Sequence, residues 1–196
     1  GVDMSRTRVN ANTVAIDGTG GVGTDDVGAS KYATGGDGVT TFRVNIAASA
    51  TLSVVGRGAA ASASGAGPLV PSPTTIGVDI QSSTLVSDGL VTVRGEAPTG
   101  TGTWIGSPTE GSQTTLVRST SPGGSVRLFG FGNDSAPANV GLRIGSSSGG
   151  EPVTVSSNSG AILIGGAGLS DGVRISAPAT IQNIGSMSGG IDIRGY

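Results

Sequence analysis

The sequence predicts an all-β fold, a right-handed parallel β-helix (β-solenoid) of about six coils with three short strands in each coil. A repeated closing phrase is the first reason: an apolar residue, any residue, a second apolar residue, any residue, and glycine. It occurs six times, at residues 14–18, 52–56, 91–95, 126–130, 162–166 and 191–195. Its glycines are separated by 38, 39, 35, 36 and 29 residues. Units of this size that hold short alternating strands are typical of stacked-repeat proteins.

A second repeated pattern comes before each closing phrase. This leading phrase is a glycine followed by apolar, any and apolar residues. Its clear copies begin at Gly1, Gly77, Gly141 and Gly172, and its less regular copies begin at Gly38 and Gly102. A short β-type run lies between the two phrases, at residues 7–9, 44–46, 84–86, 115–117, 153–155 and 180–181. The constant order of leading phrase, middle run and closing phrase predicts three strands per unit.

The order of the phrases divides the chain into approximate units 1–37, 38–76, 77–101, 102–140, 141–171 and 172–196. We expect a single β-solenoid segment over residues 1–196. The chain begins with Gly1 and shows no signal peptide, so we expect it to be part of a longer chain. A sandwich of antiparallel hairpins is the alternative, since short strands with glycine turns also suit that fold. One three-part order kept in every unit favours the β-helix.

Parallel pairing of equivalent strands, about 4.8 Å apart, predicts ladders of inward aliphatic side chains. One ladder comprises Val2, Val39, Val78, Leu142 and Val173. A second comprises Ile16, Val54, Val93, Leu128, Ile164 and Ile193. Glycine is expected at the corners because it adopts positive φ angles without steric cost.

The composition narrows the classes of function. The formal net charge is −2 and no basic stripe exists, so we expect no binding of nucleic acid. No apolar run approaches the roughly 18–20 residues of a membrane helix, so we expect no membrane insertion. The chain has neither His nor Cys, which excludes a Ser-His-Asp triad and histidine-based metal binding.

Two glycine-rich motifs overlap in the first long loop. Residues 18–23 match the dinucleotide-binding pattern G-x-G-x-x-G, but no helical apolar face follows them, as that site requires. Residues 20–27 match one nonapeptide of a calcium-binding roll, which needs ligands from consecutive turns. A single loop cation held by Asp25, Asp26 and Asp37 is a weak candidate. Solvated loop acids are the simpler interpretation, and no cofactor is predicted.

Enzymes of the polysaccharide lyase and hydrolase type also use β-helices, and they need clustered carboxylates on one sheet face. One expected outward column is Asp3, Thr40, Asp79, Trp104, Arg143 and Arg174. Another is Ala15, Ser53, Thr92, Arg127, Leu163 and Asp192. Neither column places two acids on adjacent coils, which favours an ordinary solvated face with a few ion pairs. Trp104 and Tyr32 are weak candidates for ligand contact, because an exposed ring can stack on a sugar.

The loops after the closing glycines differ in length. Two are long, residues 19–37 and 57–76, and three are short, residues 96–101, 131–140 and 167–171. The fourth unit instead lengthens its middle segment, at residues 106–114. Insertions at one corner would lie on one edge of the rod, which is often the binding face of a repeat protein. Simple length drift is the alternative, because loop entropy grows slowly with loop length.

The repeated phrases resemble those of filamentous-haemagglutinin-type large exoproteins, which use two-partner secretion. Residues 1–4 with 12–21, and residues 77–95, are most similar to the Gly- and Thr-rich repeats of cyanobacterial members. The resemblance covers nearly the whole chain and concerns the style of the repeats. It implies a long right-handed β-helical rod, exported through the outer membrane, with a role in adhesion or the extracellular matrix. The Asn-Pro-Asn-Gly motif of the family's secretion domain is absent from this sequence.

These observations together predict a structural and adhesive segment of a secreted or cell-surface fibrous protein, and not an enzyme. Its expected partners are copies of itself or flanking repeats, joined by end-to-end strand stacking, together with cell-surface glycans or matrix. A carbohydrate-active β-helix enzyme is the alternative function, and a calcium-stabilised adhesin is a third.

Overall fold

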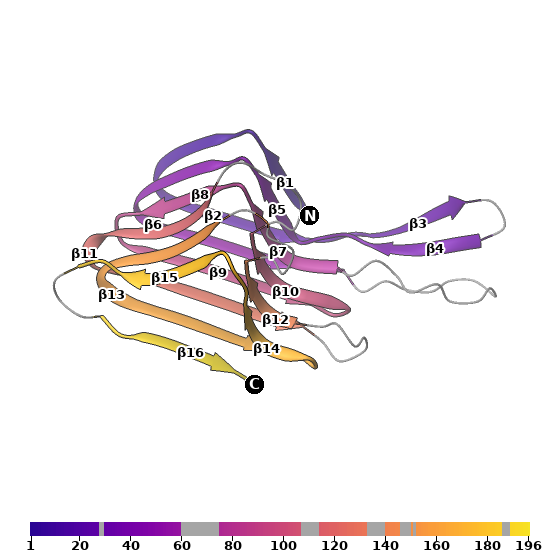
Figure 1. The fold of residues 1–196 in the computed structure, drawn as a ribbon. Helices are drawn as coiled ribbons and strands as arrows, with labels where there is room; N and C mark the ends of the chain where they lie inside the picture. The colour runs from indigo at the N-terminus through magenta and orange to yellow at the C-terminus, as the bar shows by residue number, and fades with distance from the viewer. Residues whose placement is uncertain are drawn as a thin grey trace.

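The computed structural model describes residues 1–27, 30–59, 75–106, 114–132, 140–145, 150, 152–185 and 189–196, with the backbone alone for 22–27 and 30–35. All its regular elements are strands, and the two large sheets are parallel, as predicted. Figure 1 shows the strands stacked from the N-terminal end to the C-terminal end of the chain. No helix in the described part of the chain has the length and apolar character needed to cross a membrane.

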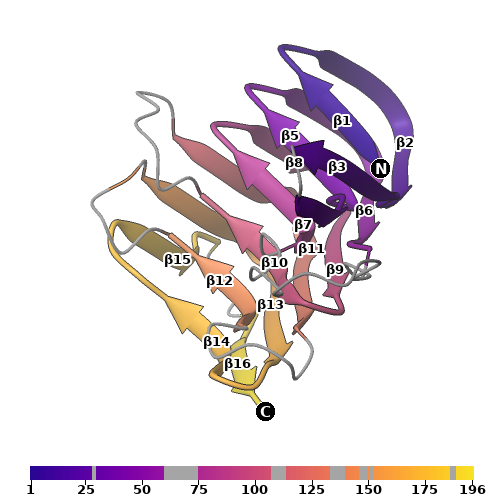
Figure 2. The ribbon, with the colours of Figure 1, turned by 90° about the vertical axis from the view of Figure 1, so that its right-hand side faces the viewer.

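The leading phrases form a six-stranded parallel sheet. Its strands, in spatial order, are β1 (Val2–Ser5), β5 (Val39–Phe42), β7 (Thr75–Gln81), β10 (Gly100–Ile105), β12 (Val140–Ile144) and β14 (Asp171–Ile175). The spatial order follows the chain order, so each unit adds one strand next to that of the preceding unit. This arrangement, which Figure 2 shows from the side, is compatible with a solenoid.

The middle runs and closing phrases form the second parallel sheet, of eight strands. These are β2 (Arg8–Thr19), β6 (Asn45–Arg57), β8 (Thr84–Ser87), β9 (Leu90–Ala97), β11 (Thr115–Gly132), β13 (Val153–Ala167), β15 (Ala179–Asn183) and β16 (Ile191–Gly195). The expectation of three separate short strands per unit is wrong for β2, β6, β11 and β13, which each contain both segments. Pairing continues through the corner between the two segments because register shifts absorb the bend, as between Ala11 and Thr13.

The registers confirm both predicted ladders. Ile16, Val54, Val93, Leu128, Ile164 and Ile193 are direct neighbours across successive strands. In the other ladder, Thr103 lies between Val78 and Leu142. The Thr103 side chain is fully buried, and its hydroxyl donates to the carbonyl oxygen of Phe129 at 2.7 Å. This hydrogen bond explains why a polar residue is tolerated in an aliphatic ladder.

The first long loop contains a β-hairpin that the sequence analysis did not predict. Strands β3 (Val22–Val27) and β4 (Ser30–Gly35) pair with each other in antiparallel fashion and with no other strand that the structure describes. Figure 1 shows the hairpin projecting away from the stacked sheets. The segment that follows the G-x-G-x-x-G pattern is therefore a strand, and the strand–turn–helix context of a dinucleotide site does not form here.

Positive φ angles occur at the corner that follows the six-stranded sheet, and the closing glycines do not have them. The first residue after five of the six strands adopts this conformation: Arg6, Arg43, Ser82, Gly106 and Gly145. Only two of these are glycines, so arginine and serine accept the strained geometry at the remaining three. The expectation that a closing glycine turns its corner through a positive φ is wrong.

The closing glycines are required for a different reason, which is the close approach of two backbone segments. At Gly18, Gly56, Gly95, Gly130 and Gly166, an added Cβ atom would lie closer than 3.0 Å to the carbonyl oxygen of the next leading glycine. Each of the five loops that follow these glycines therefore leaves and re-enters the stack through a tight pair of glycine backbones. Because this pair closes the base of the loop, the loops differ in length without disturbing the ladders.

A ladder of buried polar residues lines the corner between the middle and closing segments. Ser87, Ser119 and Ser157 are register neighbours and fully buried, and Asn183 continues the column. Each donates a hydrogen bond to a backbone carbonyl of the preceding unit. The acceptors are Ala50, Gly89, Gly124 and Gly160. These bonds satisfy carbonyl groups that the bend takes out of regular pairing.

We expect Ser119→Ala to lower the free energy of unfolding by about 1–3 kcal/mol, because the carbonyl oxygen of Gly89 loses a buried donor. Ser53→Ala is the matched control, since Ser53 points outward and is half-buried on the same sheet. That change is expected to stay within about 0.5 kcal/mol. Urea unfolding followed by circular dichroism measures both values. Equal stabilities of the two variants would contradict the role assigned to the serine ladder.

Candidate functional surfaces

Two of the three candidate cation ligands lie on the β3–β4 hairpin, and the third lies beyond its base. Asp25 and Asp26 lie on β3, where the register pairs Asp25 with Tyr32 of β4. Asp37 lies beyond the base of the hairpin, after the pairing of Val22 with Gly35. At about 3.3 Å per residue, the backbones of Asp25 and Asp37 are roughly 10 Å or more apart along the hairpin. The side chains of Asp25, Asp26 and Tyr32 are outside the described residues.

The carboxylate of Asp37 has a structural partner. Its Oδ1 atom accepts a hydrogen bond from the backbone N–H of Ile76 at 2.7 Å, near the start of β7. Burial raises the pKa of this carboxyl group, and the bond from Ile76 acts in the opposite direction. In the described part of the chain, no group of three or more acidic side chains is arranged to hold a metal ion.

We expect the stability contributed by Asp37 to fall as the pH rises. A raised pKa means that the folded state holds the proton more tightly than the unfolded state, so stability decreases from about pH 4 upward through the folded pKa. Asp37→Asn keeps an oxygen acceptor for the N–H of Ile76 and removes the titration. The difference in unfolding free energy between the two proteins should therefore shift in favour of the variant between about pH 3 and pH 7. Urea unfolding across this range measures it, and a constant difference would contradict the expectation.

Trp104 lies on the outer face of the six-stranded sheet and is half-buried. Its indole N–H donates to the carbonyl oxygen of Gly145 at 3.4 Å. The guanidinium group of Arg143 lies over the ring, 4.5 Å from its centroid. Burial, and next the positive charge of Arg174, lower the pKa of Arg143. One face of the Trp104 ring is thus covered by a cation. A cation–π interaction of this kind contributes about 1–2 kcal/mol.

The registers confirm the two outward columns that the sequence predicted. Asp3, Thr40, Asp79, Trp104, Arg143 and Arg174 are successive neighbours. Ala15, Ser53, Thr92, Arg127, Leu163 and Asp192 are the other column. The expectation of a solvated face is wrong at Asp79, which is buried and accepts a hydrogen bond from the Gln81 side-chain amide. An ion pair between two units does form as predicted. Arg57 and Glu96 are register neighbours, and the Arg57 Nε atom lies 3.4 Å from the Glu96 Oε2 atom.

An apolar groove of about 430 Å³ lies on the outer face of the eight-stranded sheet, near its C-terminal end. Its walls include Phe129, Phe131, Leu163 and Tyr196. Gly165, the register neighbour of Phe129, leaves the floor open because it has no side chain. An added Cβ atom at Gly165 would lie 2.9 Å from the Phe129 ring, so the ring leans over the glycine. Sequence reasoning missed this groove, although Phe129 and Phe131 alternate on one strand.

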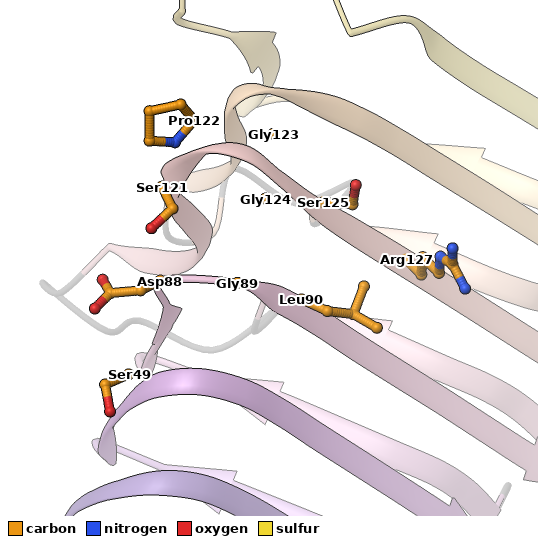
Figure 3. A pocket seen from close by; sticks show the side chains of 10 residues that line it. All are labelled: Ser49, Asp88, Gly89, Leu90, Ser121, Pro122, Gly123, Gly124, Ser125 and Arg127. Atoms are coloured by element: carbon orange, nitrogen blue, oxygen red, sulfur yellow. The ribbon is translucent and has the colours of Figure 1, made fainter.

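A polar hollow of about 450 Å³ lies at the corner between the middle and closing segments. Ser49, Asp88, Ser121 and Arg127 are among its lining residues. Asp88 accepts a hydrogen bond from the hydroxyl of Thr120 at 2.6 Å. Figure 3 shows Asp88 and Arg127 at opposite sides of the hollow, so their charged groups do not converge. The Asp88 carboxylate is thus hydrogen-bonded to a neighbouring strand residue, and the hollow does not resemble a site with a paired acid and base.

Comparison with known proteins adds no family to these observations. No protein-family model matches the chain, and no curated protein or solved structure matches it.

Proposed function

We propose that this chain is a structural and adhesive segment of a secreted or cell-surface fibrous exoprotein. The observation that carries the proposal is that five variable loops begin at equivalent positions of successive units. Five connections of very different length leave the stack at a closing glycine and return at the next leading glycine. A regular scaffold with five of its variable insertions along one corner is suited to presenting binding loops.

The scaffold in this proposal is a right-handed parallel β-helix of six coils with three sides per coil. Two parallel sheets whose spatial order follows the chain order support it, together with the continuous ladders of inward side chains. The bends in β2, β6, β11 and β13 would be the corner between the second and third sides of a coil. The style of the repeats supports membership of the filamentous-haemagglutinin-type exoproteins, with an extracellular location.

The loops would carry the adhesive contacts, and the ends of the rod would carry contacts with copies of the chain or with flanking repeats. The β3–β4 hairpin projects farthest from the sheets among the elements labelled in Figure 1. Cell-surface glycans or matrix components are the proposed ligands of the loops.

A retention experiment tests the adhesive role. Fluorescent protein is passed over beads coated with polysaccharide or with matrix protein, and the bound fraction is measured. Deleting residues 22–35 removes the hairpin, and Gly21 and Gly36 are already joined by a backbone hydrogen bond of 2.9 Å. This variant is expected to keep its β-type circular dichroism and to lose most of the retention. Thr92→Ala with Arg127→Ala, on the outer sheet face, is the matched control and should be retained normally.

Two results would overturn the proposal. One is an absence of retention of the intact chain on every surface. The other is release of sugar fragments from a polysaccharide by the chain, which would favour the carbohydrate-active enzyme.

A further inference from the structure

In the part of the chain that the structure describes, the outermost strands of the stacked sheets have a paired strand on one side only. Strands β1 and β2 are at one end, and β14, β15 and β16 are at the other. Inner ladder residues such as Val54 and Leu128 are fully buried. The terminal residues of the ladders are not: Ile193 and Ile191 are 44% and 45% exposed. Unpaired edges with apolar ladder residues are surfaces that a further strand would complete.

The same registers define what would fit each end. The position after Val173 in its ladder is equivalent to Val2, and the position after Ile193 is equivalent to Ile16. Val9 and Ile181 are the first and last residues of a third column. The apolar residues at the C-terminal end of each ladder are therefore matched by apolar residues at its N-terminal end.

Charges at the two ends are complementary in this register. The outward column that begins with Asp3 ends with Arg174, as the six-stranded sheet shows. The column that begins with Asp17 ends with Arg194. Two ends of the same kind would instead meet with antiparallel strands, so neither this register nor these charge pairs would form. Opposite charges select the direction of association more than they drive it.

The other charged residues at the ends do not oppose this pairing. The column of Arg8 ends in the neutral Thr180, and the column of Asp192 begins with Ala15. Arg6 lies at the corner after β1, where Ser176 follows β14 at the other end. Arg174 and Arg194 already pair with Asp171 and Asp192, but a guanidinium group has five N–H donors and can also bind a second carboxylate.

We propose that copies of this chain bind one another head to tail, with β14 of one copy on β1 of the next and β15 and β16 on β2. This inference rests on the proposed rod and adds its polarity, its register and its partner, a second copy. The interface joins two different surfaces and does not close on itself, so repetition gives an open filament.

Engineered cysteines test the register, because residues 1–196 contain none. Asn10 and Gln182 are exposed and neutral, and they are the first and last residues of one column. Within one molecule they are five strand spacings apart, about 24 Å, whereas a disulfide needs Cα atoms about 4.4–6.8 Å apart. Oxidation of Asn10→Cys with Gln182→Cys should therefore give a ladder of covalent oligomers on a non-reducing gel.

Two control variants separate this register from random collision. Asn10→Cys alone should stop at dimers. Asn10→Cys with Thr180→Cys displaces the second thiol by two residues and should cross-link about tenfold more slowly. Equal ladders from the displaced pair, or no ladder from the matched pair, would overturn the proposed register.

Charge reversal tests the polarity. Asp3→Arg with Asp17→Arg places arginines opposite Arg174 and Arg194, and Arg174→Asp with Arg194→Asp places aspartates opposite Asp3 and Asp17. Each variant alone should associate at least about tenfold more weakly than the natural chain, measured by sedimentation at low salt. An equimolar mixture of the two should recover association, because each introduced arginine again meets an introduced aspartate, and each natural aspartate meets a natural arginine.

The outcomes distinguish this inference from the proposed function. A natural chain that stays monomeric, or variants that associate unchanged, would overturn head-to-tail association and leave loop-mediated adhesion intact. Circular dichroism of each variant confirms that a loss of association does not come from unfolding.

Discussion

Gly95→Ala is expected to destabilise the protein by about 3 kcal/mol, at the upper end of the usual cost of overpacking. A Cβ atom at this position would overlap the carbonyl oxygen of Gly102 and approach the hydroxyl of Thr103 at 2.5 Å. Both are held in place: Gly102 closes the base of a loop, and Thr103 is hydrogen-bonded inside a ladder. The backbone segments would have to separate, which disrupts pairing in both sheets. Urea unfolding followed by circular dichroism measures the loss.

Gly195→Ala is the matched control for this prediction. Gly195 occupies the same position in the last closing phrase, but its added Cβ atom would find its nearest neighbour, the backbone nitrogen of Val173, at 3.3 Å. We expect the change in stability of the isolated chain to remain within about 0.5 kcal/mol. If both substitutions cost the same, backbone flexibility and not close approach would explain the closing glycines.

Leu128→Ala is expected to lower the free energy of unfolding by about 3 kcal/mol, within the range of 2–5 kcal/mol for such core truncations. The side chain is fully buried between its register neighbours Val93 and Ile164. Strands on both sides are fixed by continuous pairing, so the stack cannot collapse to fill the cavity. The midpoint of urea unfolding should fall accordingly.

Leu163→Ala is the control, because Leu163 is on the neighbouring strand of the same sheet but points outward and is half-buried. It should cost about 1 kcal/mol, in proportion to the apolar area that it loses. A larger effect at Leu163 than at Leu128 would contradict the assignment of the inner and outer faces.

Much of the architecture follows from short-range patterns. Alternation in the phrases identifies which side chains face inward, and the repeated order identifies equivalent positions in different units. Ile16 and Ile193 could therefore be assigned to one ladder, and the registers confirm it. The same logic placed Asp3 and Arg174 in one outward column.

The corners were harder to predict because their requirements come from backbone segments that are distant in the chain. A closing glycine looks like a turn residue in isolation, but its role depends on a carbonyl group that follows a variable loop. Positive φ angles at Arg6, Arg43 and Ser82 have no local sequence signal. The serine ladder could have been predicted in part, because Ser119 and Ser157 both lie two residues after the end of a middle run.

Little of the candidate site could be predicted. Asp79 is buried although its column suggested a solvated position, and Asp37 supports the backbone of β7. The apolar groove depends on Phe129 lying beside Gly165, two residues that are adjacent only after the strands have paired.

The sequence by itself determined the all-β class, the inward and outward faces of the strands and the residues that share a ladder, because alternation and repetition are local properties that pairing must respect. Only the tertiary structure decided which glycines are sterically required, how strands merge through a corner, and where the β3–β4 hairpin forms. Those features depend on distances between segments that stacking alone brings together. The complementarity of the two ends likewise becomes visible only when the registers connect Asp17 to Arg194 through every intervening strand.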